Sequence, residues 1–153
     1  MDFRLFELKD AFEVSKLIKR SVRIRDNSGY TKEQIDSLAD YYSPENFCLD
    51  LDKKVIYICA EGNKILGTAT LLKDYIMAVF IDPDYQRRGI GKKLMFLLEK
   101  YALKKGYSKV WLIANFSAVS FYEKLGYVRI GEKIHPHWGK GVIMEKVIFS
   151  IEG

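Results

Sequence analysis

The stretch VFIDPDYQRRGIGKKLMFLLEKYALKKGY, residues 79–107, decides the fold because it joins an apolar run directly to a helical pattern. The apolar run stops at Asp82, and Gly89 and Gly91 then lie between two arginines and two lysines. Helices usually begin with acidic or hydroxyl residues, because a helix N-terminus is already partially positive. Cations placed there instead favour the binding of an anion.

Composition places the chain among ordinary soluble globular proteins. Its 153 residues suffice for one hydrophobic core, so we expect a single domain over residues 1–153. An apolar fraction of 48% with 29% charged residues excludes wholesale disorder. The net charge of +5 is a mild excess without a basic tail. No stretch combines basic residues with interleaved aromatics, so we expect no nucleic-acid partner.

Cysteine usage and hydropathy favour a soluble cytoplasmic protein. Cys48 and Cys59 have no metal-ligand spacing, and two cysteines do not make a disulfide framework. Cys59 lies in an apolar alternating run and is predicted to be a buried thiol. The first ten residues carry charges throughout, and the longest uncharged interval, residues 110–122, is too short to span a bilayer. We therefore expect no membrane partner.

Hydrophobic periodicity predicts the order of strands and helices. Strands are predicted over residues 3–8, 54–61, 65–72, 75–81, 109–114, 127–134 and 142–149. Helices are predicted over residues 10–20, 31–41, 89–105 and 118–125. Residues 43–47 are predicted to form a loop, and the wholly apolar 75–81 a central strand buried on both faces. A hairpin combined with strand–helix–strand crossovers indicates a mixed sheet of the α+β class.

Three capping patterns mark helix starts. Asp10 is expected to cap the first helix, with Glu13 at the reciprocal position. Thr31 and Gln34 form a capping-box pattern for the second helix. Ser117 is expected to cap the last one.

The glycine loop QRRGIG differs from two common phosphate-binding motifs. The third glycine of a dinucleotide fingerprint is replaced by Leu94, and no Gly-Lys-Ser/Thr of a P-loop follows. An ordinary strand-to-helix turn remains an alternative for an isolated pair of glycines. The four neighbouring cations, Arg87, Arg88, Lys92 and Lys93, favour phosphate binding by main-chain N–H groups and the helix dipole.

Two motifs together resemble those of a known family. VFIDPDYQRRGIGKKLM, residues 79–95, resembles the acetyl-CoA-binding motif of the GNAT superfamily of N-acetyltransferases, whose core is Gln/Arg-x-x-Gly-x-Gly/Ala. NFSAVSFYEKLGY, residues 115–127, resembles its second motif. The resemblance implies a GNAT-like α+β fold, with a mixed, mainly antiparallel sheet of about seven strands flanked by about four helices. It also implies N-acetyl transfer from acetyl-CoA to a primary amine.

The resemblance implies a set of cofactor-binding residues. The central strand would splay from its neighbour after Val79, and the main chain of Val79, Phe80 and Ile81 would pair with the pantetheine amides, as a peptide adds to a sheet edge. Asn115, which opens the second motif, would also bind the cofactor. The pyrophosphate would lie on the backbone of the loop residues, namely Arg87, Arg88, Gly89, Ile90, Gly91 and Lys92.

The resemblance also implies the catalytic acid. Tyr122 would protonate the departing CoA thiolate, although the residues alone leave open that it merely packs a helix. The base stays open, because strand 75–81 holds no carboxylate. Asp74 just outside it, an ordered water, or an acceptor that arrives neutral could each serve. Neither cysteine lies in a motif, which argues against an acyl-enzyme.

Other features leave alternatives open. The loop HPHWGKG, residues 135–141, lacks an identifiable third metal ligand, so we expect no metal; it borders the acceptor site or is a plain turn. GYTKEQI, residues 29–35, similarly borders the acceptor pocket or is a simple capped helix. Exposed strand edges near the C-terminus would permit a homodimer. A catalytically silent acyl-CoA sensor is the main alternative to an enzyme, and the acceptor is not encoded in any motif.

Overall fold

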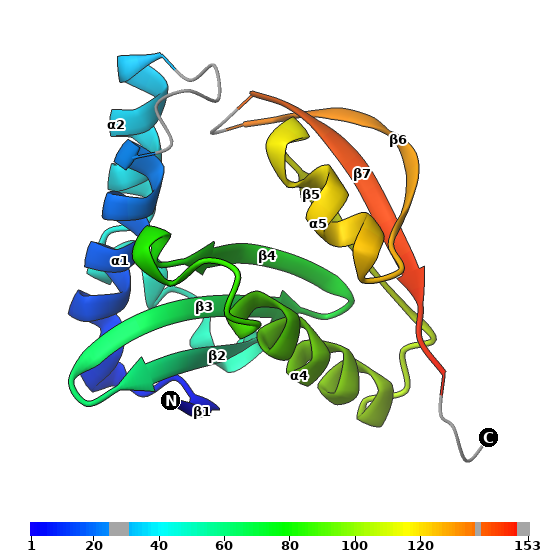
Figure 1. Cartoon of the computed structure of the whole chain (residues 1–153), viewed down its shortest axis with the longest axis horizontal. Helices are drawn as coiled ribbons and strands as arrows, with labels where there is room; N and C mark the ends of the chain where they lie inside the picture. The colour runs from blue at the N-terminus through cyan, green and yellow to red at the C-terminus, as the bar shows by residue number, and fades with distance from the viewer. Residues whose placement is uncertain (25–30, 137–138, 150–153) are drawn as a thin grey trace.

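The computed structural model describes residues 1–24, 31–136 and 139–149, and a seven-stranded sheet forms its centre (Figure 1). The strand order is β1-β2-β3-β4-β5-β7-β6, and every neighbouring pair is antiparallel except β4 and β5. This arrangement confirms the predicted fold class. The strands are β1 (Asp2–Leu5), β2 (Lys54–Glu61), β3 (Lys64–Leu72), β4 (Tyr75–Ile81), β5 (Lys109–Ala114), β6 (Val128–His135) and β7 (Gly139–Val147).

Five α-helices surround the sheet within the described residues: α1 (Ala11–Ile24), α2 (Lys32–Tyr41), α3 (Pro44–Phe47), α4 (Ile90–Lys104) and α5 (Val119–Lys124). The short α3 lies where the sequence predicted a loop. It forms because the Ser43 hydroxyl accepts a hydrogen bond from the Asn46 N–H and Pro44 presets the first turn. None of the described helices is both long and apolar enough to cross a membrane.

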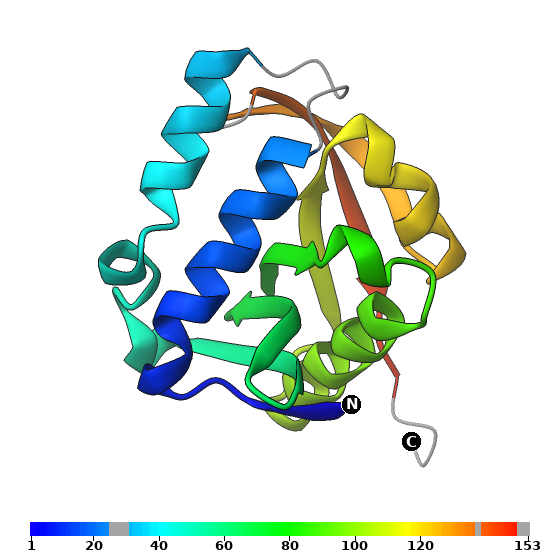
Figure 2. The ribbon, with the colours of Figure 1, turned by 60° about the vertical axis from the view of Figure 1, so that its left-hand side comes forward.

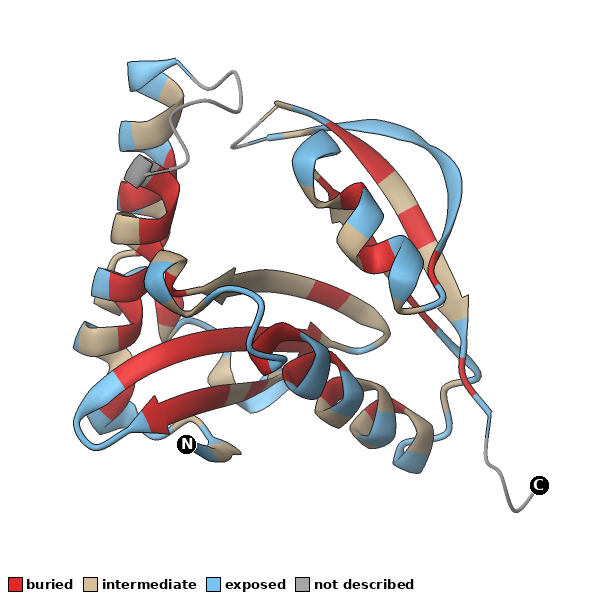
Figure 3. Ribbon diagram, viewed as in Figure 1, coloured by how far each residue is buried: buried red, intermediate tan, exposed pale blue. Residues whose placement is uncertain are grey.

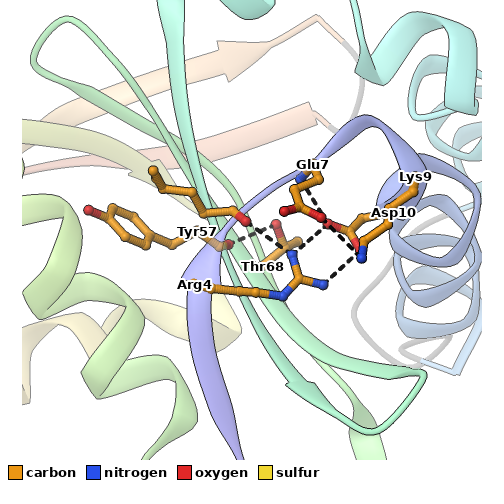
Figure 4. A network of polar contacts seen from close by, with 7 residues as sticks. Arg4, Glu7, Lys9, Asp10, Tyr57 and Thr68 are labelled. Carbon is orange, nitrogen blue, oxygen red and sulfur yellow. Dashed lines mark hydrogen bonds and ion pairs between the residues drawn. The ribbon is translucent and has the colours of Figure 1, made fainter.

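Capping at the first two helices follows different rules. The Thr31–Gln34 capping box is confirmed, with the Gln34 N–H 3.1 Å from the Thr31 hydroxyl. The prediction for Asp10 is wrong, because its carboxylate accepts hydrogen bonds from the Glu7 N–H and from the guanidinium of Arg4 (Figure 4). Arg4 holds the pKa of this buried carboxyl below its usual range. The side chain therefore fastens β1 to the start of α1 instead of capping α1.

Two hydrophobic cores lie on opposite faces of the sheet. The larger one packs α4 and α5 against one face, and the second packs α1 and α2 against the other; Figure 2 shows α1 and α2 together in front of the sheet. β3 is buried along nearly its whole length between them (Figure 3). Cys59 is fully buried as predicted, and burial raises the pKa of its thiol.

The opposite edge of the sheet is open to solvent. Among the described residues β6 pairs only with β7, and its residues from Val128 to Ile134 are all exposed (Figure 3). Apolar side chains face solvent on it, with Ile134 75% exposed. The strand was predicted, and exposed strand edges were expected near the C-terminus; exposure of both faces of β6 was not.

Candidate active site

The seam between β4 and β5 opens almost as soon as it forms. Tyr75 pairs with Trp111 and Ile76 with Leu112, and the described pairing stops there. The divergence thus begins after Ile76, not after Val79 as the sequence resemblance implied. In Figure 1 the half of the sheet that holds β5, β7 and β6 turns away from the half that holds β1 to β4. A long cofactor tail can enter such an opening from its wide end.

This divergence also corrects the predicted burial of β4. Only Ile76 in the strand is buried, whereas the remaining residues are half-buried. A strand needs a neighbour on each side and a covering layer on each face to be wholly buried. Because β5 departs, the β4 edge from Met77 to Ile81 lacks a strand partner on that side among the described residues.

A bulge turns β4 at the point where the seam is already open. Thr70 faces Met77 and Thr68 faces Phe80, so the β4 strand holds one residue more than β3 between these pairs. Ala78 has a φ of 54°, a left-handed value that bends the strand. As a result Val79 packs on the larger core, while Ala78 itself packs on the second core.

The loop after β4 is anchored by one buried carboxylate. Asp82 is 1% exposed and accepts a hydrogen bond from the Asp84 N–H at 2.9 Å. It also forms ion pairs with Arg20 of α1 and Lys64 of β3. The carboxylate therefore ties the loop to α1 and to β3 just before α4 begins.

The N-terminus of α4 is presented to solvent without a side-chain cap. Gly89 adopts a φ of 79° and Arg87 a φ of 64°, which turn the loop sharply into the helix. Because no side chain caps α4, its first N–H groups are available to an anion. Among the described residues, Arg87 and Lys92 pair with no carboxylate and are exposed, whereas Arg88 stacks on the Tyr85 ring at 4.9 Å.

The two loop glycines serve different purposes. A Cβ on Gly89 would meet no atom within 4 Å, so this position needs glycine for its positive φ alone. A Cβ on Gly91 would lie 2.9 Å from the Phe121 ring of α5. Glycine is therefore required at position 91 because α4 approaches α5 closely there. This packing role comes in addition to the close approach of a ligand that the sequence led us to expect. Ile90 between them is buried in the larger core, so only its main chain can face the loop.

Asn115 opens the second motif as a cap. Its side-chain oxygen accepts hydrogen bonds from the Ala118 N–H at 3.0 Å and from the Ser117 hydroxyl at 2.7 Å. The prediction that Ser117 caps the helix is therefore wrong, because Ser117 is itself a donor to the cap. Asn115 was expected at the cofactor, and its amide NH₂ group is the part that this capping leaves for a ligand.

Tyr122 of α5 is held among aromatic rings. Its side chain is 8% exposed, and its ring centroid lies 5.0 Å from that of Phe121 and 5.8 Å from that of Tyr127. The edge-to-face packing restricts how the phenol can turn. A tyrosine fixed in this way can direct its hydroxyl group to a defined point.

Beneath Tyr122 lies a network that sequence reasoning missed. The Tyr127 hydroxyl donates to Glu99 of α4 at 2.8 Å, and Lys146 of β7 donates to the same carboxylate at 2.8 Å. Burial, reinforced by the charge of Glu99, raises the pKa of Tyr127 far above its usual range. The network joins α4, the turn between α5 and β6, and β7. No spacing in the sequence signals it, because its members lie far apart along the chain.

Asp74 lies at the narrow end of the opening. Its carboxylate accepts a hydrogen bond from the Trp111 indole N–H at 3.2 Å, and its carbonyl accepts one from the Trp111 main chain. At about 3.3 Å per residue, the eight steps from Asp74 to Asp82, where the loop begins, span roughly 26 Å of chain. Asp74 is therefore placed at the closed seam, about one strand length from the phosphate loop.

The other sequence hypotheses concern loops. His137 and Trp138 of the HPHWGKG loop lie outside the described residues. Gly139 at the end of that loop approaches Gln34 of α2, which brings the two segments expected near the acceptor beside each other. No cluster of three potential metal ligands occurs within the residues that the structure describes.

A family comparison identifies the class of protein. The pattern of the family described as "Acetyltransferase (GNAT) domain" matches residues 27–148. Because this match covers more than half of the chain, the chain belongs to the GNAT acetyltransferase family. The prediction of an acetyl-CoA-dependent acetyltransferase, with acetyl-CoA as cosubstrate, is thereby confirmed at the level of the family.

Individual relatives agree with this assignment. The glucosamine 6-phosphate N-acetyltransferase of Schizosaccharomyces pombe is 33% identical over 94 residues, covering 54% of this chain and 85% of that protein. A GCN5-related N-acetyltransferase of Rhodopseudomonas palustris superimposes with a TM-score of 0.88 at 24% identity, covering 96% of this chain and 95% of the other. The PaiA N-acetyltransferase of Thermoplasma acidophilum, solved with coenzyme A, gives 0.77 at 21% identity, covering 97% and 100%. The two structures share the fold of this chain.

Proposed function

We propose that this protein transfers the acetyl group of acetyl-CoA directly to a primary amine, with Tyr122 as the general acid. The observation that carries the proposal is the short seam between β4 and β5, paired only at Tyr75 and Ile76. Beyond these pairs, the main chain of β4 from Val79 to Ile81 has an edge available to the amide groups of pantetheine. A nearly complete parallel seam would leave no such edge.

The phosphate end of coenzyme A would lie at the start of α4. The helix is 15 residues long and has no side-chain N-cap, so its dipole and N–H groups favour an anion. Arg87 and Lys92 supply two exposed cations without partners among the described residues. Arg88 is already stacked on Tyr85, which presents its guanidinium in a defined place. The pyrophosphate would thus be held by the backbone of residues 87–92 and by these side chains.

The chemistry requires one bond to form and one to break. The neutral amine nitrogen attacks the thioester carbonyl carbon, a new C–N bond forms, and the C–S bond breaks. The sulfur leaves as a thiolate and takes a proton from the Tyr122 hydroxyl, while the amine releases its proton to a base. Direct transfer agrees with the burial of Cys59, which is fully enclosed and cannot serve as an acyl carrier at the surface.

Asp74 is the proposed base. Asp74 is bonded to the Trp111 indole at the closed end of the opening, so its role would be to receive the proton through a water molecule. An Asp74→Asn substitution keeps the acceptor oxygen for Trp111 and removes the carboxylate. A base role predicts that the pH profile of kcat/KM loses its acidic limb in this variant, whereas a structural role leaves the limb in place.

Calorimetric titration with acetyl-CoA tests the binding part of the proposal. We expect micromolar affinity, weakened for dephospho-CoA and for the Arg88→Glu variant, because each loses a charge-assisted contact to phosphate. Absence of binding at millimolar acetyl-CoA would overturn the assignment.

Turnover of Tyr122→Phe tests the chemical part. Loss of a general acid is expected to lower kcat by about a hundredfold while the affinity for acetyl-CoA is kept. Full turnover would remove Tyr122 as the acid. Tight acetyl-CoA binding with no acetylation of any amine by the wild-type protein would instead favour the silent sensor.

A further inference from the structure

The edge strand β1 is shorter than the strand it pairs with, and a cavity opens where it ends. The last pair of the two strands is Leu5 with Tyr57, and the Phe6 N–H then donates to the Ile56 carbonyl at 2.8 Å. β2 begins two residues before Ile56, at Lys54. A cavity of about 330 Å³ lies beside this end of β2. The residues that line it are Leu5, Phe6, Leu8, Leu51, Lys54, Val55, Ile56 and Tyr101.

The cavity lies at the margin of both hydrophobic cores. Val55 and Tyr101 pack against the larger core, whereas Phe6 and Leu51 pack against the second one. β1 pairs with residues 57–60 of β2, and no described strand pairs with the same edge at the start of β2. Because no strand continues β1 there, side chains from both layers line one shared cavity.

The rim of the cavity is apolar and open to solvent. Leu8 is 71% exposed and Leu5 is 55% exposed. Single exposed leucines are common on protein surfaces, but these two border a cavity whose remaining lining is also mostly apolar. A ligand that covers them removes apolar surface from water, which is favourable. The lining therefore favours a ligand with an apolar part.

One cation lies in this apolar lining. Lys54 is half-buried, and it forms no ion pair with the residues that the structure describes. Its ammonium group donates to the Phe47 carbonyl at 3.4 Å, a long hydrogen bond that uses one of its three donors. Burial lowers the pKa of Lys54, and the charge of Asp50 opposes this only in part. Asp50 itself is exposed and pairs with Lys53 at 4.0 Å. A half-buried ammonium without a counter-ion is stabilised by a ligand that brings an anion.

Volume and charge narrow the ligand to one class. A water molecule occupies about 30 Å³, so a cavity of about 330 Å³ holds roughly ten non-hydrogen atoms. This volume is at the lower end of the usual range for ligand pockets. Lys54 is the only cation among the described residues that line the cavity, so a second negative charge would have no partner there. A single carboxylate on an aliphatic chain, with about eight carbons in all, meets both limits.

We propose that this cavity binds a small aliphatic monocarboxylate, whose carboxylate pairs with Lys54 and whose chain lies against the leucines of the lining. The inference goes beyond the proposed acetyl transfer, because the cavity is remote from the start of α4. At about 1.5 Å per residue, Tyr101 lies roughly 16 Å along α4 from Ile90. Acetyl-CoA and the carboxylate can therefore be bound at the same time.

Nuclear magnetic resonance of the isotope-labelled protein locates the ligand without relying on turnover. Sodium octanoate is titrated in the presence of saturating acetyl-CoA. We expect saturable shifts of the backbone amides of residues 5–8 and 51–56 and of Tyr101, with a Kd of about 0.1 to 1 mM. Shifts centred on residues 87–92, or shifts that do not saturate, would overturn the proposal. If acetyl-CoA itself does not bind, the proposed function fails, and the octanoate titration still decides this site.

Ligands that share either the chain or the charge of octanoate test the class. Octanol keeps the chain without the charge, octylamine reverses the charge, and butyrate keeps the carboxylate on a shorter chain. We expect octanol and butyrate to bind at least about tenfold more weakly than octanoate, because one loses the ion pair and the other loses buried carbons. Octylamine should give no saturable shift. Equal affinities for octanol and octanoate, or saturable binding of octylamine, would overturn the proposal.

Substitutions at two neighbouring lysines test the ion pair. Lys54→Met keeps the length of the side chain and removes its charge, so the affinity for octanoate should fall about tenfold. Lys53→Met is the matched control, because Lys53 is exposed and does not line the cavity, and it should keep the affinity. Dispersed amide spectra show whether each variant is folded; if Lys54→Met is not, the comparison of octanol with octanoate on the wild type decides. Equal octanoate affinity in the wild type and folded Lys54→Met would overturn the proposal.

Two exposed leucines give an independent test of the chain. Leu8→Ala should weaken octanoate binding about threefold, because it removes apolar contact at the rim. Leu49→Ala removes a leucine that is 60% exposed and does not line the cavity, so the affinity should stay unchanged. Equal affinities in the two variants would mean that the chain does not lie on this rim, which would overturn the proposed placement.

Discussion

The two motifs that identify the family have opposite surroundings. In the first, residues 79–95, the cations around the two glycines are exposed and the start of α4 is uncapped. The second, from Asn115 to Tyr127, is tied to α4 and β7 through the bonds of Glu99 to Tyr127 and Lys146. The first motif is therefore arranged for a ligand that is not part of the chain. The second is stabilised by the chain itself, and Tyr122 takes its position from that packing.

This difference separates binding from stability. Exposed, unpaired cations contribute little to the free energy of unfolding, because solvent screens them. The Glu99 carboxylate, which is 12% exposed and has two donors, contributes more, because removing it leaves both donors without their partner. Substitutions in the first motif should consequently change ligand affinity at constant stability, and substitutions beneath the second should do the reverse.

The largest effect is expected from Glu99→Ala. It leaves the Tyr127 hydroxyl and the Lys146 ammonium without their shared partner, at a cost of about 3 kcal/mol in the free energy of unfolding. Urea denaturation measures the loss, and Glu99→Gln, which keeps an acceptor for Tyr127, should lose less. Acetyl-CoA affinity of the folded Glu99→Ala protein should stay near that of the wild type. A large loss of acetyl-CoA affinity with unchanged stability would contradict the separation of binding from stability between the two motifs.

Gly91→Ala should come next. The added Cβ would lie 2.9 Å from the Phe121 ring, so α4 and α5 must separate or the ring must turn, at a cost of about 2 kcal/mol. Because the strain falls next to Tyr122, we expect kcat to fall as well. Gly89→Ala is the matched control, since its cost is backbone strain at a φ of 79° with no neighbour displaced. Calorimetric melting measures the stability of both variants, and turnover assays measure their kcat. Equal kcat values for Gly91→Ala and Gly89→Ala would contradict a steric effect of the α4–α5 contact on Tyr122.

Lys92→Glu tests the first motif directly. The reversed charge beside the start of α4 should weaken acetyl-CoA binding about tenfold, or about 1.4 kcal/mol, with stability changed by less than about 0.5 kcal/mol. Lys100→Glu makes the same change on an exposed position farther along α4 and should leave the affinity unchanged. The measurement is titration calorimetry at low and high salt. Equal losses of acetyl-CoA affinity in both variants would mean that the affinity depends on the net charge of the protein and not on the position of Lys92.

The smallest effect is a pH dependence. Burial raises the pKa of Tyr127, so the unfolded chain releases this proton first, near pH 10, while the folded chain still holds it. Stability from Tyr127 is therefore full below pH 10 and falls above it by about 1.4 kcal/mol per pH unit. Tyr127→Phe should show a slope shallower by about 1 kcal/mol per pH unit between pH 10 and 11 in urea denaturation, because the unfolded phenol is only partly ionised there. Identical slopes would contradict the raised pKa.

Much of the fold could be predicted from the sequence because local patterns dictate it. Strand periodicity and the Thr31 capping box were recognisable, and the loop before α4 was identified by its glycines and cations. Caps were predicted less well where two side chains could accept the hydrogen bond at one position. Ser117 and Asn115 are both good caps, and only the structure shows that Ser117 donates to Asn115. Asp10 was claimed by Arg4, a residue that no local pattern connects to it.

The parts of the site formed by consecutive residues could be predicted from the sequence, whereas the parts formed by residues on different strands could not. Apolar continuity made β4 look buried on both faces, because sequence does not reveal that β5 departs after two pairs. The same limitation hid the cavity beside Lys54, whose lining includes residues of β1, β2 and α4. Cross-strand neighbours of this kind follow from register, which the sequence does not state.

The short seam also has a consequence for how the native protein opens. Two paired positions join β1–β4 to β5–β7, so little hydrogen bonding resists their separation. Backbone amides of β3, paired on both sides and buried, should be among the slowest to exchange with deuterium. Amides of β5 and β7 should exchange as a second, faster group. Acetyl-CoA bound between β4 and β5 would join the two halves of the sheet. The exchange rates of the β3 amides and of the β5 and β7 amides would then become more similar.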